Sequence, residues 1–211
     1  KRQPIRGAGA NFVSNANGIT NEGFEIEIQY QANDRLNIAG NYSYTKTEYG
    51  EDYFVLTVDD PTNPVAVFGQ CTQGYVSCED DNPAFVTDYT VNLKGGPLKG
   101  IPEDKFTLNI TYEMDSRWGP IWLFATHSYT GAFSASGVQR DLDRFESREI
   151  TIISASWYSE DGSVNVRAYI DNLFDNDNYY ALSTGDHETN YRKSVTALPP
   201  RVMGVDMRYR F

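Results

Sequence analysis

The stretch Val202-Met-Gly-Val-Asp-Met-Arg-Tyr-Arg-Phe211 alternates apolar and polar side chains and ends on an aromatic residue. In a β-strand, successive side chains point to opposite faces. One face would carry Met203, Val205, Met207, Tyr209 and Phe211, and the other Gly204, Asp206, Arg208 and Arg210. The alternation therefore predicts a strand with one apolar face and one charged face.

The overall composition is compatible with a membrane β-barrel. Of the 211 residues, 40% are hydrophobic, 22% are charged and 14% are aromatic, and the mean hydropathy is -0.52. A low mean hydropathy does not exclude a barrel, because each spanning strand needs only about ten residues and every second side chain faces the lumen. No run approaches the roughly 18 apolar residues of a spanning helix, which excludes helical insertion. The aromatic residues suit the girdles at the two membrane interfaces.

The charge and the first residues set two further expectations. The formal net charge is -11, and so acidic a chain repels a phosphate backbone, which argues against nucleic acid as a partner. The sequence begins at Lys1, without Met and without a charged-then-apolar signal segment. We therefore expect a mature, processed or incomplete N-terminus.

Alternation with a period of two predicts about eight strands and hardly any helix. The expected strands lie near residues 6–13, 24–30, 36–45, 106–113, 118–131, 149–158, 164–173 and 202–211. The first of them is weak. The segment Ile121-Trp-Leu-Phe124 is apolar on both faces, so its facing stays open.

The connections between these strands alternate in length. Tight turns are expected at 31–35, 114–117 and 159–163, and long connections at about 50–101, 134–148 and 176–198. Outer-membrane barrels have short periplasmic turns and long extracellular loops. The pattern therefore predicts an all-β fold, an antiparallel transmembrane β-barrel, with Phe211 at the periplasmic rim.

Four short motifs follow one another along the chain. They are Gly23-Phe-Glu-Ile-Glu-Ile28, Leu93-Lys-Gly-Gly-Pro-Leu-Lys-Gly-Ile-Pro102, Asn172-Leu-Phe-Asp175 with Tyr179-Tyr180, and Pro200-Arg-Val-Met-Gly204 before the final strand. Their order and spacing resemble the C-terminal part of TonB-dependent outer-membrane receptors. The resemblance implies that residues 1–211 form about the last eight strands of a 22-stranded barrel, and that the N-terminal plug and the earlier strands are not in this chain.

The resemblance also implies a function and a set of partners. The function would be uptake of a scarce nutrient across the outer membrane of a Gram-negative bacterium, most often an iron-siderophore complex. TonB would supply the energy through the plug, and the transported complex, not a resident cofactor, would be the bound group. Other partners would be membrane lipid, lipopolysaccharide, the barrel-assembly machinery and a small-molecule substrate.

Two groups of residues acquire roles from this resemblance. Met207, Tyr209 and Phe211 would form the C-terminal signal that the assembly machinery reads. The lumen-facing wall would include Glu25, Glu27, Arg167, Asp171, Asp206, Arg208 and Arg210. These charged residues would contact the plug, or they would be solvated lumen residues. The residues that bind substrate are not identified.

The longest predicted loop contains both cysteines, Cys71 and Cys78. A disulfide between them suits an exported protein, and the alternatives are two free thiols or half of a metal site. The same loop carries two acidic clusters, Asp59-Asp60 and Glu79-Asp-Asp-Asn82. They could bind a cation or a cationic substrate, or they could be ordinary solvated charges.

Three other motifs invite a chemical interpretation. Asp175-Asn-Asp-Asn178 resembles the start of a calcium loop, but Tyr180 occupies the position that an EF-hand reserves for Gly. His127 and Ser128 are adjacent on a predicted strand, so they project to opposite faces and cannot form a catalytic dyad. His187-Glu188, in the last long connection, could touch a ligand or could be a plain loop segment. We expect no catalytic residues.

Three alternative architectures remain. The first is a complete eight-stranded outer-membrane barrel with a structural or adhesive role, filled by its own side chains. The second is an outer-membrane hydrolase, which requires a His and a Ser on the same face or a set of carboxylates. The third is a soluble β-sandwich binding module, which requires polar outward faces.

Overall fold

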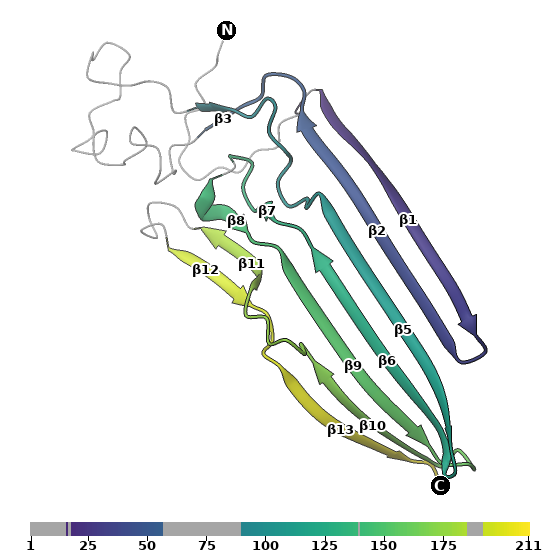
Figure 1. Ribbon diagram of the computed structural model, residues 1–211. Helices are drawn as coiled ribbons and strands as arrows, with labels where there is room; N and C mark the ends of the chain where they lie inside the picture. Colours follow the sequence, from purple (N-terminus) through teal and green to yellow (C-terminus); the bar gives the residue numbers. More distant parts are fainter. Residues whose placement is uncertain (1–15, 17, 57–89, 139, 185–191) are drawn as a thin grey trace, which may run out of the picture.

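The computed structural model describes residues 16, 18–56, 90–138, 140–184 and 192–211. Seven long strands form one antiparallel sheet in the order β1-β2-β5-β6-β9-β10-β13 (Figure 1). Their bounds are β1 Ile19–Asn33, β2 Leu36–Tyr49, β5 Asp104–Ser116, β6 Gly119–Thr130, β9 Arg148–Tyr158, β10 Val164–Asp171 and β13 Val202–Tyr209. Each long strand pairs with the next one along the chain, so the sheet is an open meander with β1 and β13 at its edges.

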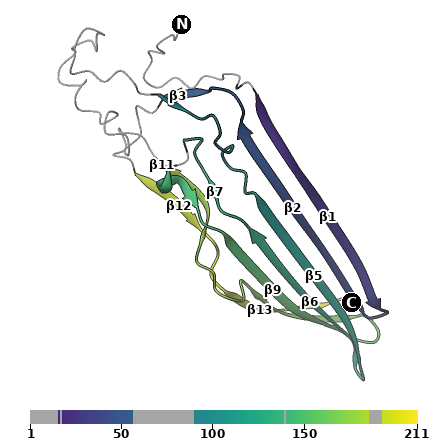
Figure 2. The same cartoon turned by 45° about the horizontal axis from the view of Figure 1, so that its top comes forward.

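These seven strands confirm seven of the eight predicted ones; the strand predicted at 6–13 lies outside the described residues. The tight turns occur at 34–35, 117–118 and 159–163, at the end of the sheet that holds the C-terminus (Figure 1). The described parts of the long connections lie at the opposite end (Figure 2). We call these ends the turn end and the loop end. The predicted all-β antiparallel architecture is confirmed.

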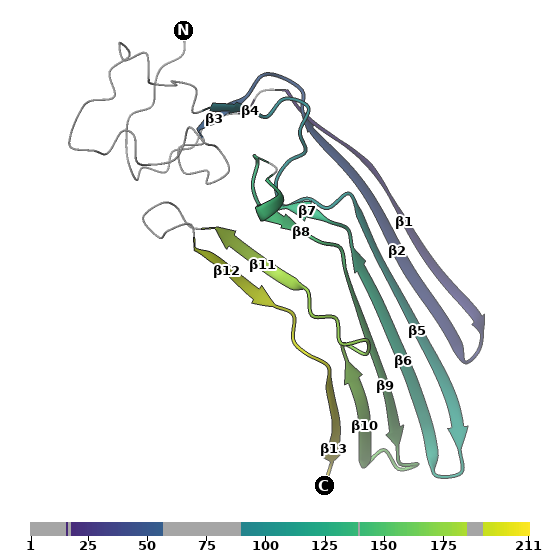
Figure 3. The same cartoon turned by 60° about the vertical axis from the view of Figure 1, so that its left-hand side comes forward.

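Three small hairpins at the loop end were not predicted. They pair β3 Phe54–Leu56 with β4 Thr90–Asn92, β7 Phe133–Ser134 with β8 Arg144–Phe145, and β11 Tyr179–Thr184 with β12 Lys193–Ala197 (Figure 3). These strands are too short for a period of two to be detected in the sequence. They form because neighbouring long strands bring the two ends of each connection together. The described residues also contain one 3-10 turn, η1 Asp141–Asp143.

The strand register gives the sheet two chemically different faces. Across the apolar face, one row runs through Ile38, Ile110, Ala125, Ile153, Ile170 and Met203. The neighbouring row on the other face runs through Asn37, Thr111, Phe124, Ser154, Tyr169 and Gly204. We call these the apolar face and the polar face. In the described residues no helix is long and apolar enough to cross a membrane.

The register also determines which side chains of β6 lie on each face of the sheet. Ile121 and Leu123 pair with Met114 and Tyr112 on the apolar face. Trp122 and Phe124 therefore lie on the polar face, where their partners are Glu113 and Thr111. The alternation of β6 alone left this open, because both of its faces are apolar there. Only the neighbours across the strand decide it.

Aromatic residues gather near both ends of the apolar face. Toward the loop end lie Phe24, Tyr42, Tyr44, Phe106 and Tyr129, and toward the turn end lie Tyr112, Trp157 and Tyr209. The Phe24 ring lies 5.8 Å from that of Tyr42 and 5.7 Å from that of Tyr44, measured between centroids. Ile, Leu, Val and Ala dominate between the two groups. This distribution is the girdle pattern of membrane barrels.

Candidate ligand-binding rim

The described parts of the long connections form a layer at the loop end, which we call the rim: residues 50–56, 90–103, 131–138, 140–147, 172–184 and 192–201. Its apolar centre is small. Leu93 and Phe145 are buried, and the Phe133 ring stacks on that of Phe145 with centroids 4.6 Å apart. A Cβ on Gly137 would lie 3.2 Å from Leu93 Cδ1. The first and second connections therefore pack against each other.

The motif that begins at Leu93 ties the first connection to β2. Tyr49 N donates to Gly96 O at 3.0 Å, and Gly95 N donates to Tyr49 O at 2.8 Å. The φ of Gly95 is +79°, a left-handed conformation that favours glycine. Leu98 N donates to the buried Thr47 Oγ1 at 3.0 Å. The motif thus holds the base of the longest connection at a defined place.

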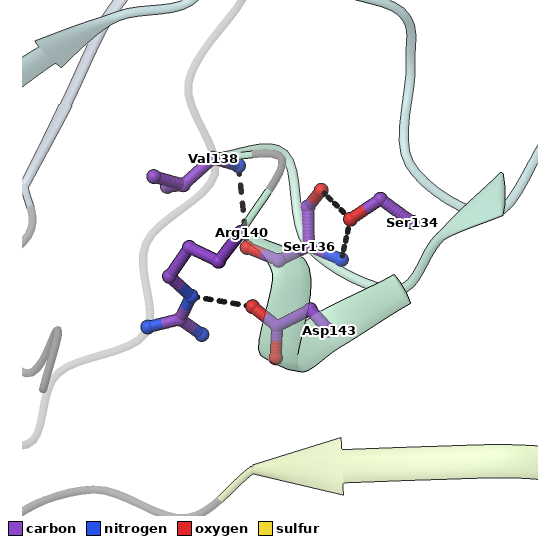
Figure 4. A network of polar contacts seen from close by, with 5 residues as sticks. All are labelled: Ser134, Ser136, Val138, Arg140 and Asp143. Carbon is purple, nitrogen blue, oxygen red and sulfur yellow. Dashed lines mark hydrogen bonds and ion pairs between the residues drawn. The ribbon is translucent and has the colours of Figure 1, made fainter. Parts of the chain in front are cut away.

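The second connection is organised around a buried carboxylate. Asp143 is buried, and Arg140 Nε donates to its Oδ2 at 2.5 Å (Figure 4). Nearby, Ser134 Oγ donates to Ser136 O at 2.8 Å, and Ser136 Oγ accepts from Val138 N at 3.2 Å (Figure 4). A buried carboxylate requires a charged or hydrogen-bonding partner. The connection therefore has one preferred arrangement at its base.

A polar cavity of about 360 Å³ opens between the first and second connections. Among the residues that line it are Glu103, Asp104, Tyr129, Arg140, Asp141 and Arg144. Backbone hydrogen bonds of 2.8 Å join its walls, from Gly100 N to Ser134 O and from Gly131 N to Asp104 O. Its volume lies in the range of about 300–1,000 Å³ typical of small-molecule sites. With charges of both signs, this rim pocket suits a polar ligand.

The third connection is anchored by Asn172, which is buried and has a φ of +51°. Its Nδ2 donates to Asn176 O and to Pro199 O, both at 2.9 Å, and its Oδ1 accepts from Asn176 N at 2.9 Å. One side chain therefore joins the end of β10 to the segment that precedes β13. Asn tolerates the left-handed conformation better than most residues.

The neighbouring residues complete this anchor. Asp175 Oδ1 accepts from Arg201 N at 2.8 Å, and Asn178 Nδ2 donates to Ser147 O at 2.8 Å. In the part of the chain that the structure describes, no group of three or more His, Cys, Asp or Glu side chains is placed to hold a metal ion. The Asn172-Leu-Phe-Asp175 motif therefore connects three segments of the rim.

The predicted wall residues share one face of the sheet. Glu25 and Glu27 pair with Ser43 and Asn41, and Arg167 pairs with Asp206. By alternation, Asp171 and Arg208 belong to the same polar face, and Arg210 follows β13 with its N donating to Ser163 O at 2.9 Å. Met207 and Tyr209 lie on the apolar face, and the Tyr209 and Phe211 rings meet edge to face, 5.1 Å apart.

The adjacent pair His127 and Ser128 is split between the faces, as their positions on one strand require. His127 lies on the apolar face, where its Nδ1 is 2.8 Å from Thr151 Oγ1. Ser128 lies on the polar face between Thr107 and Ile150. The two side chains form no dyad.

Several predicted sites lie outside the described residues. They are Cys71 and Cys78, Asp59-Asp60, Glu79-Asp-Asp-Asn82 and His187-Glu188. Sequence reasoning in turn missed the Arg140–Asp143 pair and the role of Asn172. For Asn172 a signal existed, because Asn at the end of a strand is a residue type that adopts positive φ and caps backbone groups. The buried charge pair has no comparable signal.

Comparison with known proteins identifies the fold. Residues 2–173 match the family described as TonB dependent receptor-like, beta-barrel. No curated protein matches the chain. Among solved structures, the ferric yersiniabactin uptake receptor FyuA from Yersinia pestis is similar, with a TM-score of 0.63 and 14% identity over 92% of this chain and 24% of that one.

Two further solved structures give the same result. The siderophore receptor PiuA from Acinetobacter baumannii has a TM-score of 0.58 and 15% identity over 90% of this chain and 21% of its own. The ferric citrate transporter FecA in the unliganded form has a TM-score of 0.59 and 14% identity over 92% of this chain and 24% of its own. The chain thus spans about a quarter of the length of these structures. It belongs to the TonB-dependent receptor β-barrel family of Gram-negative outer-membrane proteins.

Proposed function

We propose that this chain is the C-terminal part of an outer-membrane receptor that imports a ferric-siderophore complex with energy supplied through TonB. The observation that carries the proposal is the family's sheet topology joined to an organised rim at the loop end. The names of structural relatives support the choice of ligand, because they describe receptors or transporters of ferric yersiniabactin, siderophore and ferric citrate. The family consists of transport receptors, which fits a role without catalysis.

The two faces of the sheet have different roles in this proposal. The apolar face meets membrane lipid, and the polar face lines the lumen, where Glu25, Arg167 and Asp206 contact the plug or water. This facing is supported by the contrast between the two faces and by the aromatic groups at both ends of the apolar one. The loop end is then extracellular. The chain's final strand, with Met207, Tyr209 and Phe211, is the segment presented to the assembly machinery.

Substrate contact belongs to the extracellular rim. The rim pocket provides Arg140 and Arg144 beside Glu103, Asp104 and Asp141, a mixed set that suits a ligand with both carboxylate and hydroxyl or amine groups. The anchors at Leu93 and Asn172 hold the bases of two connections in place. When the bases of the connections are fixed, their remaining residues can differ between receptors of different substrates. This division favours a receptor over a closed eight-stranded barrel with an adhesive role.

Uptake measurements test the proposal directly. Uptake of radiolabelled iron is measured with a panel of ferric siderophores. A strain that lacks the gene should lose uptake from at least one of them, and a plasmid copy of the gene should restore it. Deletion of tonB should abolish the same uptake, whereas growth with abundant free iron should be unaffected. Uptake that survives both deletions would contradict the proposed transport role. If the TonB-dependent uptake concerns only sugars or vitamins, the proposed receptor role stands and the proposed ligand is wrong.

The predicted Cys71–Cys78 disulfide is tested separately. Peptide mass spectrometry of the receptor without reductant should find the two cysteines in one cross-linked species, and reductant should separate them. Alkylation of both thiols in the unreduced receptor would contradict the prediction.

A further inference from the structure

The apolar face of the sheet carries a hollow of about 540 Å³ that spans β5, β6, β9 and β10. Three small residues, Ala125, Ala155 and Ala168, lie side by side in it, because Ala155 pairs with Ala168 and Ala125 lies in the next row. Larger side chains on the same face surround them: Ile110, Tyr112, Leu123, Ile153 and Ile170. The hollow is therefore a gap in the side-chain layer over a stretch of alanines.

The lining determines what kind of group fits. Phe124, Ser154 and Tyr169 also border the hollow, but the register directs their side chains to the polar face. Among the apolar-face side chains that line the hollow, the Tyr112 hydroxyl supplies the one polar atom. A polar or charged ligand would lose its hydrogen bonds with water here without replacement. The hollow suits a hydrocarbon chain.

The position along the strands places the hollow within one half of a bilayer. Leu123 and Ala125 follow the start of β6 at Gly119 by a few residues, and Ala155 precedes the end of β9 at Tyr158. At a rise of about 3.3 Å per residue and a tilt of about 40°, Leu123 and Ala125 stand roughly 10–15 Å above the turn end. Half of the hydrocarbon core is about 15 Å thick. The hollow therefore belongs to the leaflet on the turn side, which is the periplasmic one.

A cationic site lies below it at the level of the lipid headgroups. Arg117 occupies the β5–β6 turn, and its guanidinium carbon lies 3.8 Å from the centroid of the exposed Trp118 ring. Trp157 Nε1 donates to Trp118 O at 3.1 Å, so both indoles are gathered at this turn. Trp and Arg together are typical of the membrane interface, where Arg attracts lipid phosphate.

We propose that the hollow binds one acyl chain of a periplasmic-leaflet phospholipid whose phosphate lies at Arg117. The inference rests on the proposed facing of the sheet. The binding force is close packing in the hollow together with the charge at the turn, because a hydrocarbon chain gains no hydrophobic free energy on leaving other lipid tails. Lipopolysaccharide does not fit, because its acyl chains occupy the opposite leaflet.

Photo-crosslinking in proteoliposomes tests the site. The native-length receptor is reconstituted in phosphatidylethanolamine and phosphatidylglycerol with a phospholipid that carries a diazirine near the end of one acyl chain, and cross-linked residues are mapped by mass spectrometry. Ile38 and Met203 serve as controls, because they lie in the same row of the apolar face as Ile110 and Ile153 but outside the hollow. We expect crosslinks at Ile110 and Ile153 to exceed those at the controls about tenfold, the ratio that corresponds to 1.4 kcal/mol.

Two variants sharpen the result. Ala155→Phe fills the hollow and should reduce the excess crosslinking to the control level. Val205→Phe adds the same ring in the same row but outside the hollow, and it should leave the excess crosslinking unchanged. Arg117→Gln should lower the excess severalfold. A gel-mobility shift on heating verifies that each variant is folded.

The possible outcomes separate the two proposals. Even labelling along the apolar face means annular lipid only and overturns the site while leaving the facing intact. Labelling of polar-face residues such as Thr107 in place of the apolar face overturns the facing itself. Displacement of the probe by added lipopolysaccharide but not by phospholipid also overturns the assignment.

Discussion

The long strands and the rim are held together by different interactions. In the sheet, backbone N–H and C=O groups pair between neighbouring strands, except along the outer edges of β1 and β13, and both faces stay at least partly exposed. In the rim, side chains bond to backbone groups, and every buried side chain of the described residues lies there or at the loop end of β2: Thr47, Leu93, Pro102, Ser134, Asp143, Phe145 and Asn172.

The proposed membrane setting accounts for this contrast. A sheet that crosses a bilayer has lipid on one side, so it needs a complete backbone ladder and one apolar face but no buried core. A layer that projects into water must bury its own side chains to hold one arrangement. It lacks a continuous ladder, so Asn, Ser, Thr and Asp side chains satisfy its backbone groups. Substitutions should therefore act by different rules in the two regions.

The largest expected effect is the loss of stability caused by a charge on the apolar face of the sheet. Ile153→Arg places a charge near the middle of β9 and should lower the free energy of unfolding by about 2–4 kcal/mol, the cost of Arg at the bilayer midplane. Ser154→Arg is the matched control, because Ser154 is the next residue and projects to the polar face; it should cost under about 1 kcal/mol. Guanidinium unfolding of the receptor refolded in vesicles measures both. Equal costs would contradict the assignment of the faces.

The next largest effect is a loss of stability in the rim that leaves the sheet unchanged. Asn172→Asp keeps the acceptor oxygen but loses the Nδ2 donor to Asn176 O and Pro199 O, which should cost about 1–3 kcal/mol. Hydrogen exchange of residues 173–184 and 192–201 should accelerate, while exchange in β5 and β6 stays unchanged. Asn37→Asp, at a more exposed Asn that donates to Gln31 Oε1 at 2.9 Å, is the control. Faster exchange throughout the sheet would show that the two regions are not independent.

A smaller effect concerns close packing on the polar face. A Cβ on Gly204 would lie 2.5 Å from Tyr169 Cζ, so Gly204→Ala should cost about 1–2 kcal/mol by overpacking. In a Tyr169→Ala background the same change should stabilise the sheet by about 0.5–1 kcal/mol, because Gly is unfavourable within a strand. Gly40→Ala is the control, since its Cβ would lie 3.5 Å from Thr107 O. A double-mutant cycle without this change of sign would refute the packing explanation.

The smallest effect concerns pH at the β9–β10 turn. Asp161 accepts hydrogen bonds from Ser159 Oγ and from Ser163 N and Oγ, which lower the pKa of its carboxyl to about 2. A folded-state pKa below the unfolded value of about 3.9 stabilises the fold above that value, and the contribution is lost as pH falls from about 4 to about 2.

Asp161→Asn should therefore slightly lower the unfolding midpoint at neutral pH and reduce its fall between about pH 4 and pH 2. Glu160→Gln, at the adjacent residue, controls for the loss of one negative charge. An unchanged pH profile in Asp161→Asn would show that the turn's hydrogen bonds do not persist in solution.

The strands could be predicted because each of them shows the alternation of apolar and polar residues by itself. Residues 24–30 in β1 and 202–209 in β13 alternate clearly, and the Asp161-Gly162 turn signal joins two strands that do pair. The rim could not be predicted in the same way. Arg140 and Asp143 are ordinary charged loop residues in the sequence, and their pairing depends on η1 and on the packing of Phe133 against Phe145.

The sequence by itself determined that this is an all-β chain of a membrane-barrel family, the alternation of its short and long connections and the charged set on its polar face, because a period of two is a local property of the backbone. Only the tertiary structure decided the facing of Trp122 and Phe124, the bond from Asn172 to Pro199 and the hollow over Ala125, Ala155 and Ala168. The facing and the hollow depend on register between strands, and the bond joins residues that lie 27 apart in the sequence. Each is a relation between distant segments, and no single segment contains it.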